Sequence, residues 1–335
     1  MKKLVMINTV YSLFIDILLN HSWKKNIYVF DRENFNEKDL DFFYKNKLNF
    51  TTFVPIKKDK KIIKNVCNYF KYIISIIKII IYILKENIKI INGSDSVLPL
   101  SLKFKLEFQY LIEDGMLNYK LPKDRNDIKK KIIDFLLLRP INYKPFGYSK
   151  NIKKIYLTGL APIPEEIKAK VEIINLKELW NKKTKEEKEE ILDIFNFNEN
   201  IINTIKNKKN ILFTQPLSED GFISEEEKVN LYKRIISNYK KEELVIKTHP
   251  REKTNYKEYF PNVEILNQSF PAELLDLLDI NFEKVITIFS TAALNFSKNA
   301  EMDFYGTKIH SQLLKLWGDS DKIMKANKFL ELDEE

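Results

Sequence analysis

The chain of 335 residues contains very little cysteine, histidine or glycine. It has one cysteine, Cys67, three histidines and 7 glycines. A single cysteine excludes a disulfide framework, and together with three histidines it cannot form a zinc site with the usual ligand spacing. No Gly/Ser/Pro-rich tract marks a flexible linker. We therefore expect a protein without disulfides, bound metal or cofactor, held together by its apolar core.

The chain carries more positive than negative charge. Its net charge is +9, and lysines are most concentrated between Lys57 and Lys89. Such a surplus suits an anionic partner, which could be a nucleic acid, a membrane surface or a nucleotide sugar. No helix-turn-helix, RNA-recognition or zinc pattern accompanies it, so we expect no nucleic-acid partner. The first apolar run, Leu4–Val10, is interrupted by Asn8 and lacks a cleavage site, which favours a buried strand in a cytoplasmic protein over a signal peptide.

Short apolar segments alternate with longer amphipathic segments along the chain. This alternation predicts βαβ units with parallel sheets, in an α/β fold of two Rossmann-like domains, residues 1–150 and 151–335. The predicted strands are Leu4–Ile7, Ile27–Phe30, Ile88–Ile91, Phe108–Ile112, Lys154–Leu157, Val171–Ile174, Ile211–Thr214, Leu244–Lys247 and Val285–Phe289. The predicted helices are Tyr11–Leu19, Lys38–Tyr44, Lys61–Lys85, Asp127–Leu137, Lys185–Phe195, Glu225–Tyr239 and Ala272–Leu278.

The predicted helix over residues 61–86 has an unusual pattern. Lysines recur every seven residues at Lys64, Lys71, Lys78 and Lys85, so they form one narrow stripe, and most of the other residues are apolar. A transmembrane helix is disfavoured because two lysines would lie near the middle of the bilayer. Two interpretations stay open. The helix packs in a core or an oligomer, or it lies on an anionic membrane with its lysines reaching the headgroups.

Three polar motifs follow predicted strands of the C-terminal half. In the first, the strand ends at Pro216, and a turn with two adjacent carboxylates precedes the helix at Glu225. Glycine in this turn allows the backbone to approach a ligand closely. The two carboxylates also have a structural explanation, because the helix dipole favours acidic residues before any helix. The candidate residues are Thr214, Gln215, Pro216, Glu219, Asp220 and Gly221.

The second motif is Lys247-Thr248-His249-Pro250. Proline restricts His249 to extended geometry and so holds its imidazole at the strand tip, between Lys247 and Arg251. Such an imidazole suits a leaving phosphate, and the alternative is a surface histidine before a turn. The third motif is Phe289-Ser290-Thr291, after which a helix begins. Hydroxyls and N–H groups at a helix start bind phosphate, although simple capping by Ser290 explains the same residues.

A second acidic-acidic-glycine turn, Glu113-Asp114-Gly115, follows the predicted strand Phe108–Ile112 in the N-terminal half. The chain therefore has two turns of the same composition, one in each predicted domain. Each turn offers carboxylates at the carboxyl end of a parallel strand, where ligands bind in open α/β sheets.

The three C-terminal motifs resemble the signature blocks of bacterial sialyltransferases. They are most similar to those of glycosyltransferase family 52, the lipooligosaccharide sialyltransferases, over about residues 205–310. The resemblance implies a GT-B fold, in which two Rossmann-like domains face each other across a cleft. It also implies inverting transfer of sialic acid from CMP-sialic acid, without a metal, to a terminal galactose of lipooligosaccharide or capsule. The N-terminal domain would lie on the acceptor side, and the C-terminal domain would bind the donor.

The resemblance also implies roles for residues and partners. Asp220 would be the catalytic base and His249 the partner of the leaving phosphate, while the other residues of the three motifs bind CMP-sialic acid. Polysialyltransferases keep the base in the N-terminal domain, which makes Glu113 or Asp114 the alternative. The family further implies a homodimer, with exchanged N-terminal domains, on the cytoplasmic face of the inner membrane. Another donor sugar, polysialic acid synthesis or a non-catalytic role in surface-glycan assembly stay open, as does the choice between α2,3 and α2,6 linkage.

Overall fold

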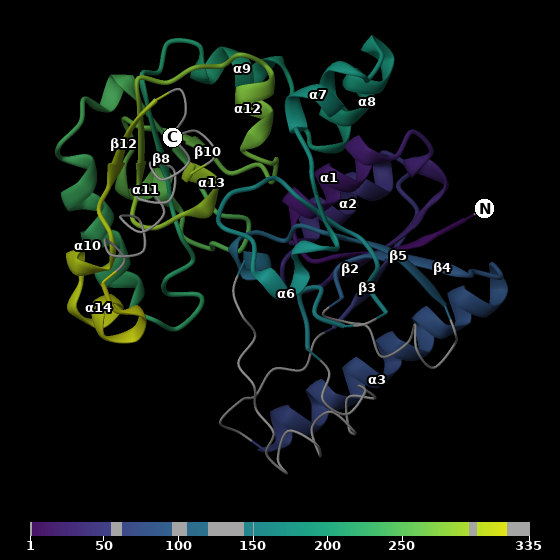
Figure 1. The fold of residues 1–335 in the computed structure, drawn as a ribbon. Helices are drawn as coiled ribbons and strands as arrows, with labels where there is room; N and C mark the ends of the chain where they lie inside the picture. Colours follow the sequence, from purple (N-terminus) through teal and green to yellow (C-terminus); the bar gives the residue numbers. More distant parts are fainter. Residues whose placement is uncertain are drawn as a thin grey trace. The chain divides into compact units, whose positions relative to one another are not determined.

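The computed structural model describes residues 2–54, 62–95, 106–119, 144–149, 151–294 and 300–319. The chain divides into two compact units, Met1–Lys188 and Glu189–Glu335. Each unit contains one parallel sheet with helices packed on it (Figure 1). The predicted α/β fold with two parallel sheets is therefore confirmed.

The N-terminal unit is built on a seven-stranded sheet with the order β3-β2-β1-β4-β5-β6-β7. The order reverses between β1 and β4, and the carboxyl ends of strands on both sides of such a reversal are the usual place for a ligand. The strands are β1 (Leu4–Ile7), β2 (Ile27–Asp31), β3 (Phe50–Phe53), β4 (Ile90–Gly93), β5 (Glu107–Ile112), β6 (Ile155–Leu157) and β7 (Val171–Ile173). The α-helices are α1 (Val10–Leu19), α2 (Glu37–Lys45), α3 (Ile62–Lys85), α6 (Glu165–Lys168), α7 (Leu176–Asn181) and α8 (Lys185–Ile194), with 3-10 turns at Trp23–Lys25 and Met116–Tyr119.

The division between the units lies later than residue 150. The strands β6 and β7, which we assigned to the second domain, extend the N-terminal sheet by pairing with β5 and with each other. Both strands have only three residues. Strands this short carry no pattern that tells which sheet they join, so the boundary could not be read from the sequence.

The helix α3 buries one side and exposes the other. Its side chains Tyr72, Ile76, Ile79 and Ile83 belong to the core beneath the sheet. The opposite side exposes an apolar stripe of Phe70, Ile74, Ile77, Ile81 and Leu84. By length and composition, the segment Cys67–Lys85 could cross a membrane, with a mean hydropathy of 1.6. The predicted helix is thus confirmed from Ile62 onward, while Lys61 and the side chain of Lys64 lie outside the described part.

The C-terminal unit has a five-stranded sheet with the order β10-β9-β8-β11-β12. The core side of α10 (Glu225–Ile236) packs on this sheet, with Leu231, Tyr232 and Ile235 against the buried strands. The strands are β8 (Asn210–Phe213), β9 (Leu244–Lys247), β10 (Glu264–Leu266), β11 (Lys284–Thr287) and β12 (Glu301–Phe304). The helices are α9 (Glu199–Ile205), α10 (Glu225–Ile236), α11 (Tyr256–Tyr259), α12 (Glu273–Leu277), α13 (Thr291–Leu294) and α14 (Ser311–Trp317), with 3-10 turns at Lys241–Glu243 and Thr307–Ile309. The predicted helix Asp127–Leu137 lies outside the described residues.

Candidate active site

The three C-terminal motifs lie at the ends of three adjacent strands. β8 pairs with β9 on one side and with β11 on the other. The sheet order reverses between β8 and β11, as it does between β1 and β4 in the other unit. Thr214, His249 and Ser290 each follow one of these strands, so the fold brings them to the edge where ligands bind in such sheets. We call this group of residues the C-terminal cluster.

His249 is held by the backbone around it. Its N–H donates to Oε2 of Glu252 at 2.8 Å, and its Nδ1 accepts from the backbone N–H of Arg251 at 3.1 Å. Burial lowers the pKa of the imidazole to about 3, helped by the positive charges of Arg251 and Lys247. The ring is therefore neutral at physiological pH. Because Nδ1 is the acceptor, the proton sits on Nε2 and is available to a ligand.

Asp220 forms an ion pair within this cluster. Its two carboxylate oxygens accept from the two terminal nitrogens of Arg251, at 2.5 and 3.0 Å. This bidentate pair joins the turn after β8 to the turn after β9, and both side chains are partly exposed. The two charges compensate each other, so Asp220 and Arg251 together position the backbone that orients His249.

A buried lysine lies behind the cluster. Lys228 of α10 has no exposed side-chain surface, and its ammonium donates to both oxygens of Glu219 at 3.0 and 2.8 Å. It also lies 3.3 Å from Glu225 and 3.8 Å from Glu252. Burial alone would raise the pKa of Glu219, but the hydrogen bonds from Lys228 and from the N–H of Lys253 lower it below its usual range. Glu219 therefore serves to anchor its own turn to α10 and to the His249 turn.

Glu252 connects the same network to β8. It accepts from the hydroxyl of Thr214 and, at 2.6 Å, from that of Tyr256, in addition to the N–H of His249. Burial raises the pKa of Glu252, against the effect of these hydrogen bonds and of Lys228. Glu252 therefore fixes His249 relative to the end of β8.

Other residues predicted to bind the donor also have contacts within the fold. The Lys247 ammonium donates to the carbonyls of Thr248 and Gln268, at 3.2 and 2.9 Å, and lies 4.5 Å from the centre of the Phe270 ring. The hydroxyl of Thr248 donates to the carbonyl of Leu266 at 3.3 Å. These contacts tie the end of β9 to the segment around β10.

The turn residues on either side are similarly fixed. Gly221 has a φ of +74°, which L side chains rarely adopt. The N–H of Gln215 donates to the Tyr232 hydroxyl at 2.8 Å, and Pro216 is buried. Ser290 is buried and its N–H donates to Thr287, while Phe289 packs on Trp317 with ring centres 4.9 Å apart. The side chain of Thr291 lies outside the described residues.

The second acidic turn lies at the carboxyl end of β5, within the N-terminal unit. Asp114 is half-buried, and it accepts from the amide of Asn8 at 2.8 Å and from the hydroxyl of Thr9 at 3.0 Å. The same Asn8 amide donates to Ser94 after β4, at 2.7 Å. Burial raises the pKa of Asp114 to about 7, and the charges of Asp31 and Asp95 add to the shift. These side chains form an N-terminal cluster at the reversal point of the first sheet.

Glu113 points into the same unit and is fully buried. It accepts from the N–H and the hydroxyl of Thr158 and from the hydroxyl of Tyr119, at distances between 2.5 and 3.0 Å. Burial raises its pKa, although these hydrogen bonds oppose the shift. With no exposed surface, Glu113 ties β5 to β6 and leaves Asp114 as the accessible carboxyl of this turn.

The sequence analysis missed Lys228, Glu252, Asn8 and Thr9 as members of the two clusters. Asn8 and Thr9 carried a signal, because a polar pair ends the first apolar strand and Thr9 caps α1. Lys228 and Glu252 gave none, since each looks like one more charge in a charged stretch. Among the described residues, no three His, Cys, Asp or Glu side chains are grouped so that they could hold a metal ion.

The chain is similar in sequence to known proteins. The profile of glycosyltransferase family 52 matches residues 23–313. An uncharacterized protein from Haemophilus influenzae is 45% identical over 242 residues, which are 71% of this chain and 76% of that protein.

Two solved structures resemble the whole fold. One is an α/β-galactoside α-2,3-sialyltransferase from Photobacterium phosphoreum, with a TM-score of 0.53, 13% identity and coverage of 90% of this chain and 89% of that one. The other is a sialyltransferase from Photobacterium damsela, with a TM-score of 0.50, 14% identity and coverage of 94% and 78%. The predicted GT-B fold is confirmed. Because the family profile matches most of the chain, the chain belongs to glycosyltransferase family 52.

Proposed function

We propose that this glycosyltransferase moves sialic acid from CMP-sialic acid to a galactose-terminated acceptor of lipooligosaccharide or capsule, with inversion at the anomeric carbon. The observation that carries the proposal is the neutral His249, held at the end of β9 with a proton on Nε2. CMP leaves through a phosphate oxygen. The Nε2–H of His249 can donate a hydrogen bond to this phosphate as the glycosidic bond breaks.

The leaving-group step follows from the electrostatics of His249. A phosphate placed beside Nε2 raises the pKa of the imidazole, because the negative charge favours the protonated form. The Nε2–H donates to the phosphate oxygen, and this hydrogen bond strengthens as charge builds on the departing CMP. The start of α13 follows the neighbouring strand end, where the N–H groups of a helix start can contact phosphate. In this mechanism the protein's own groups stabilise the leaving phosphate, so we expect no metal requirement.

The base must remove a proton from the acceptor hydroxyl. We propose Asp114 for this role, because its pKa of about 7 lies close to the operating pH and its hydrogen-bond donors are neutral. Asp220, which the family resemblance favours, is the alternative base. Its carboxylate is engaged at both oxygens by Arg251, so it must first leave that pair to accept a proton.

The experiment is a donor screen with the purified protein. Lactose is incubated with CMP-sialic acid or with UDP-linked hexoses, with and without EDTA, and the products are identified by mass spectrometry. We expect sialyllactose from CMP-sialic acid alone, unaffected by EDTA. A hexosylated product identifies a transferase with another donor, repeated addition identifies a polysialyltransferase, and no transfer with any donor favours a non-catalytic role. Each of these three results contradicts the proposal.

We also propose that the protein lies on the cytoplasmic face of the inner membrane through α3. The exposed apolar residues are spaced four and three apart, so they form one stripe along the helix. Lys71, Lys78 and Lys85 are exposed, and each directly follows a residue of that stripe. Apolar side chains bordered by lysines suit an anionic lipid surface.

Vesicle flotation tests this placement. We expect binding to vesicles containing phosphatidylglycerol, weaker binding at high salt, and loss of binding in Ile77→Asp. An exposed residue away from α3, Ile202, gives the matched control Ile202→Asp, which should still bind. Sedimentation equilibrium tests the alternative, in which a second copy of the chain packs on the exposed stripe of α3. A dimer that dissociates in Ile77→Asp, without vesicle binding by the wild type, would assign the stripe to a homodimer.

A further inference from the structure

The ion pair between Asp220 and Arg251 is the exposed part of a network that is otherwise buried. The side chain of Arg251 is 32% exposed and that of Asp220 is 23% exposed. The side chains of Lys228 and Glu252, in contrast, are 0% and 1% exposed. Within the described part of the chain, the guanidinium and the Asp220 carboxylate bond only to each other. The pair is therefore the part of the C-terminal cluster that a dissolved ligand can reach.

The backbone around His249 is also held by contacts other than this pair. Glu252 accepts from the N–H of His249 at 2.8 Å. Glu219, in the turn after β8, accepts from the N–H of Lys253, in the turn after β9, at 2.6 Å. These contacts join the two turns whether or not Asp220 meets the guanidinium. A ligand can therefore replace the Asp220 carboxylate without releasing His249.

The guanidinium of Arg251 is arranged for a carboxylate. Its two terminal nitrogens donate to the two oxygens of one carboxylate, that of Asp220, at 2.5 and 3.0 Å. A planar fork of this kind binds carboxylate or phosphate through two hydrogen bonds, which an ammonium group cannot reproduce. The Asp220 side chain thus shows the shape of the group that the fork accepts.

Arg251 lies next to the imidazole that we assign to the leaving phosphate. Its backbone N–H donates to Nδ1 of His249 at 3.1 Å. In CMP-sialic acid, the carboxylate and the phosphate are attached to the same anomeric carbon, so the two anionic groups lie side by side. A donor whose phosphate meets His249 therefore brings its carboxylate close to Arg251.

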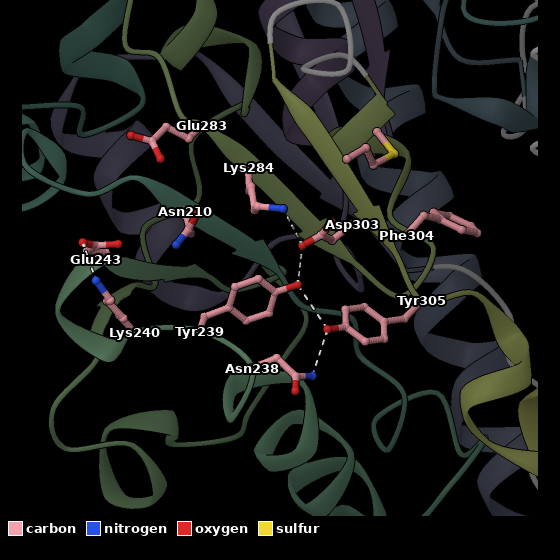
Figure 2. A pocket seen from close by; sticks show the side chains of 11 residues that line it. Asn210, Asn238, Tyr239, Lys240, Glu243, Glu283, Lys284, Asp303, Phe304 and Tyr305 are labelled. Atoms are coloured by element: carbon pink, nitrogen blue, oxygen red, sulfur yellow. Dashed lines mark hydrogen bonds and ion pairs between the residues drawn. The ribbon is translucent and has the colours of Figure 1, made fainter.

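The opposite edge of the same sheet is less suited to an anionic donor. A hollow at this edge is bordered by the first residues of β8 and β11, by β12 and by the segment after α10 (Figure 2). Its lining has more acidic than basic side chains, namely Glu243, Glu283, Asp303, Lys240 and Lys284. A surplus of negative charge disfavours a ligand that carries a phosphate and a carboxylate. The donor is therefore expected at the carboxyl edge, where Arg251 lies.

We propose that Arg251 binds the carboxylate of sialic acid in the donor, and that Asp220 is the internal carboxylate which the donor displaces. The inference rests on the proposed function, because it needs a donor with a carboxylate beside the phosphate. It assigns a residue that distinguishes CMP-sialic acid from sugar nucleotides without this group. The exchange keeps the guanidinium paired, since one carboxylate replaces another, and the partly exposed Asp220 is returned to water.

Calorimetry with two ligands measures the contact with the donor carboxylate. The full-length protein is titrated with CMP and with a fluorinated CMP-sialic acid that is transferred only slowly. The ratio of the two dissociation constants reports what the sialic acid part adds to binding. In the wild type we expect the fluorinated sugar nucleotide to bind more tightly than CMP.

Three variants test the role of Arg251. Arg251→Lys keeps the positive charge and removes the fork, so we expect about tenfold weaker binding of the fluorinated donor and CMP binding within about twofold of the wild type. Asp220→Asn removes the competing carboxylate, so the fluorinated donor should bind more tightly relative to CMP. The control is Arg234→Lys, at an exposed arginine of α10 that donates to the carbonyl of Ile309 at 3.1 Å. It should bind both ligands like the wild type.

The assignment of Arg251 is overturned if Arg251→Lys binds both ligands like the wild type, or if Asp220→Asn binds the fluorinated donor less tightly relative to CMP. It is also overturned if Arg251→Lys loses CMP and the fluorinated donor equally, because the arginine then serves the phosphate. In these three cases CMP binding by the wild type leaves the nucleotide site in place. A wild type that binds neither ligand contradicts the proposed function as well.

Discussion

The two acidic-acidic-glycine turns have the same composition and opposite electrostatic surroundings. In both, the glycine has a positive φ, +102° at Gly115 and +74° at Gly221, and in both the glutamate is tied into its own unit. Glu113 and Asp114 accept hydrogen bonds from neutral groups, and their pKa values are raised. Glu219 contacts Lys228, and Asp220 contacts Arg251.

The triplet therefore positions two carboxyl groups but does not set their charge. Where the surroundings are neutral donors, desolvation dominates and the acid keeps its proton to a higher pH. Where the buried Lys228 is adjacent, hydrogen bonds lower the pKa of Glu219 and its turn becomes an anchor. The N-terminal turn is thus suited to exchange a proton, and the C-terminal turn is suited to hold His249 in place.

The largest expected effect is on stability and comes from removing the cation of the C-terminal turn. In Lys228→Met, Glu219 and Glu252 lose their buried counter-ion, so the free energy of unfolding should fall by about 3–5 kcal/mol in urea denaturation. The surface pair of Lys154 with Glu172, 2.7 Å apart, gives a control. Lys154→Met should unfold like the wild type, and a similar result for Lys228→Met would remove the anchoring role.

The second effect is on the pH dependence of activity. The proposed base Asp114 can accept a proton only when ionised, so kcat/KM should fall about tenfold per pH unit below a pKa of about 7, and about 100-fold by pH 5. Asp220→Asn should keep this limb, because Asp220 does not cause it. A limb that disappears in Asp220→Asn would instead point to the C-terminal turn.

A smaller effect concerns the stability of the N-terminal turn. The folded protein holds a proton on Asp114 that an unfolded chain releases above its ordinary pKa of 3.8, so this contribution to stability is present at low pH and lost as the pH rises through about 7. Asp114→Asn cannot ionise and should therefore be more stable than the wild type at pH 8, by about 1–3 kcal/mol. The difference should vanish below pH 4. A variant less stable at both pH values would show that Asp114 is mainly a structural group.

The sequence predicted the central strands well and the edges poorly. β9 was predicted residue for residue, and β1 as well, since both are continuous apolar runs buried on two faces. The strands β3, β10 and β12 were missed, and all three lie at sheet edges, with exposed or half-exposed residues in the pattern. Their pairing depends on the neighbouring strand, which is far away in the sequence.

The candidate site was predictable in its position and not in its charge states. Strand ends and proline placed His249 and the acidic turns, because those signals are local. The neutral state of His249 and the pairing of Asp220 depend on Arg251 and on burial, which only the folded chain defines. The burial of Lys228 is the clearest example of a feature that the sequence could not predict. Nothing in the run Glu225-Glu226-Glu227-Lys228 distinguishes a buried cation from a solvated one.

Sialyl transfer by paired variants of the two turns tests most directly which turn holds the base. Wild type, Asp114→Asn and Asp220→Asn are incubated with CMP-sialic acid and lactose, and initial rates of sialyllactose formation are measured after a thermal melt has confirmed folding. We expect transfer by the wild type, a kcat lower by about 10²–10⁴-fold in Asp114→Asn, and a clearly smaller loss in Asp220→Asn. An active Asp114→Asn beside a folded and inactive Asp220→Asn would contradict this expectation and place the base in the C-terminal turn.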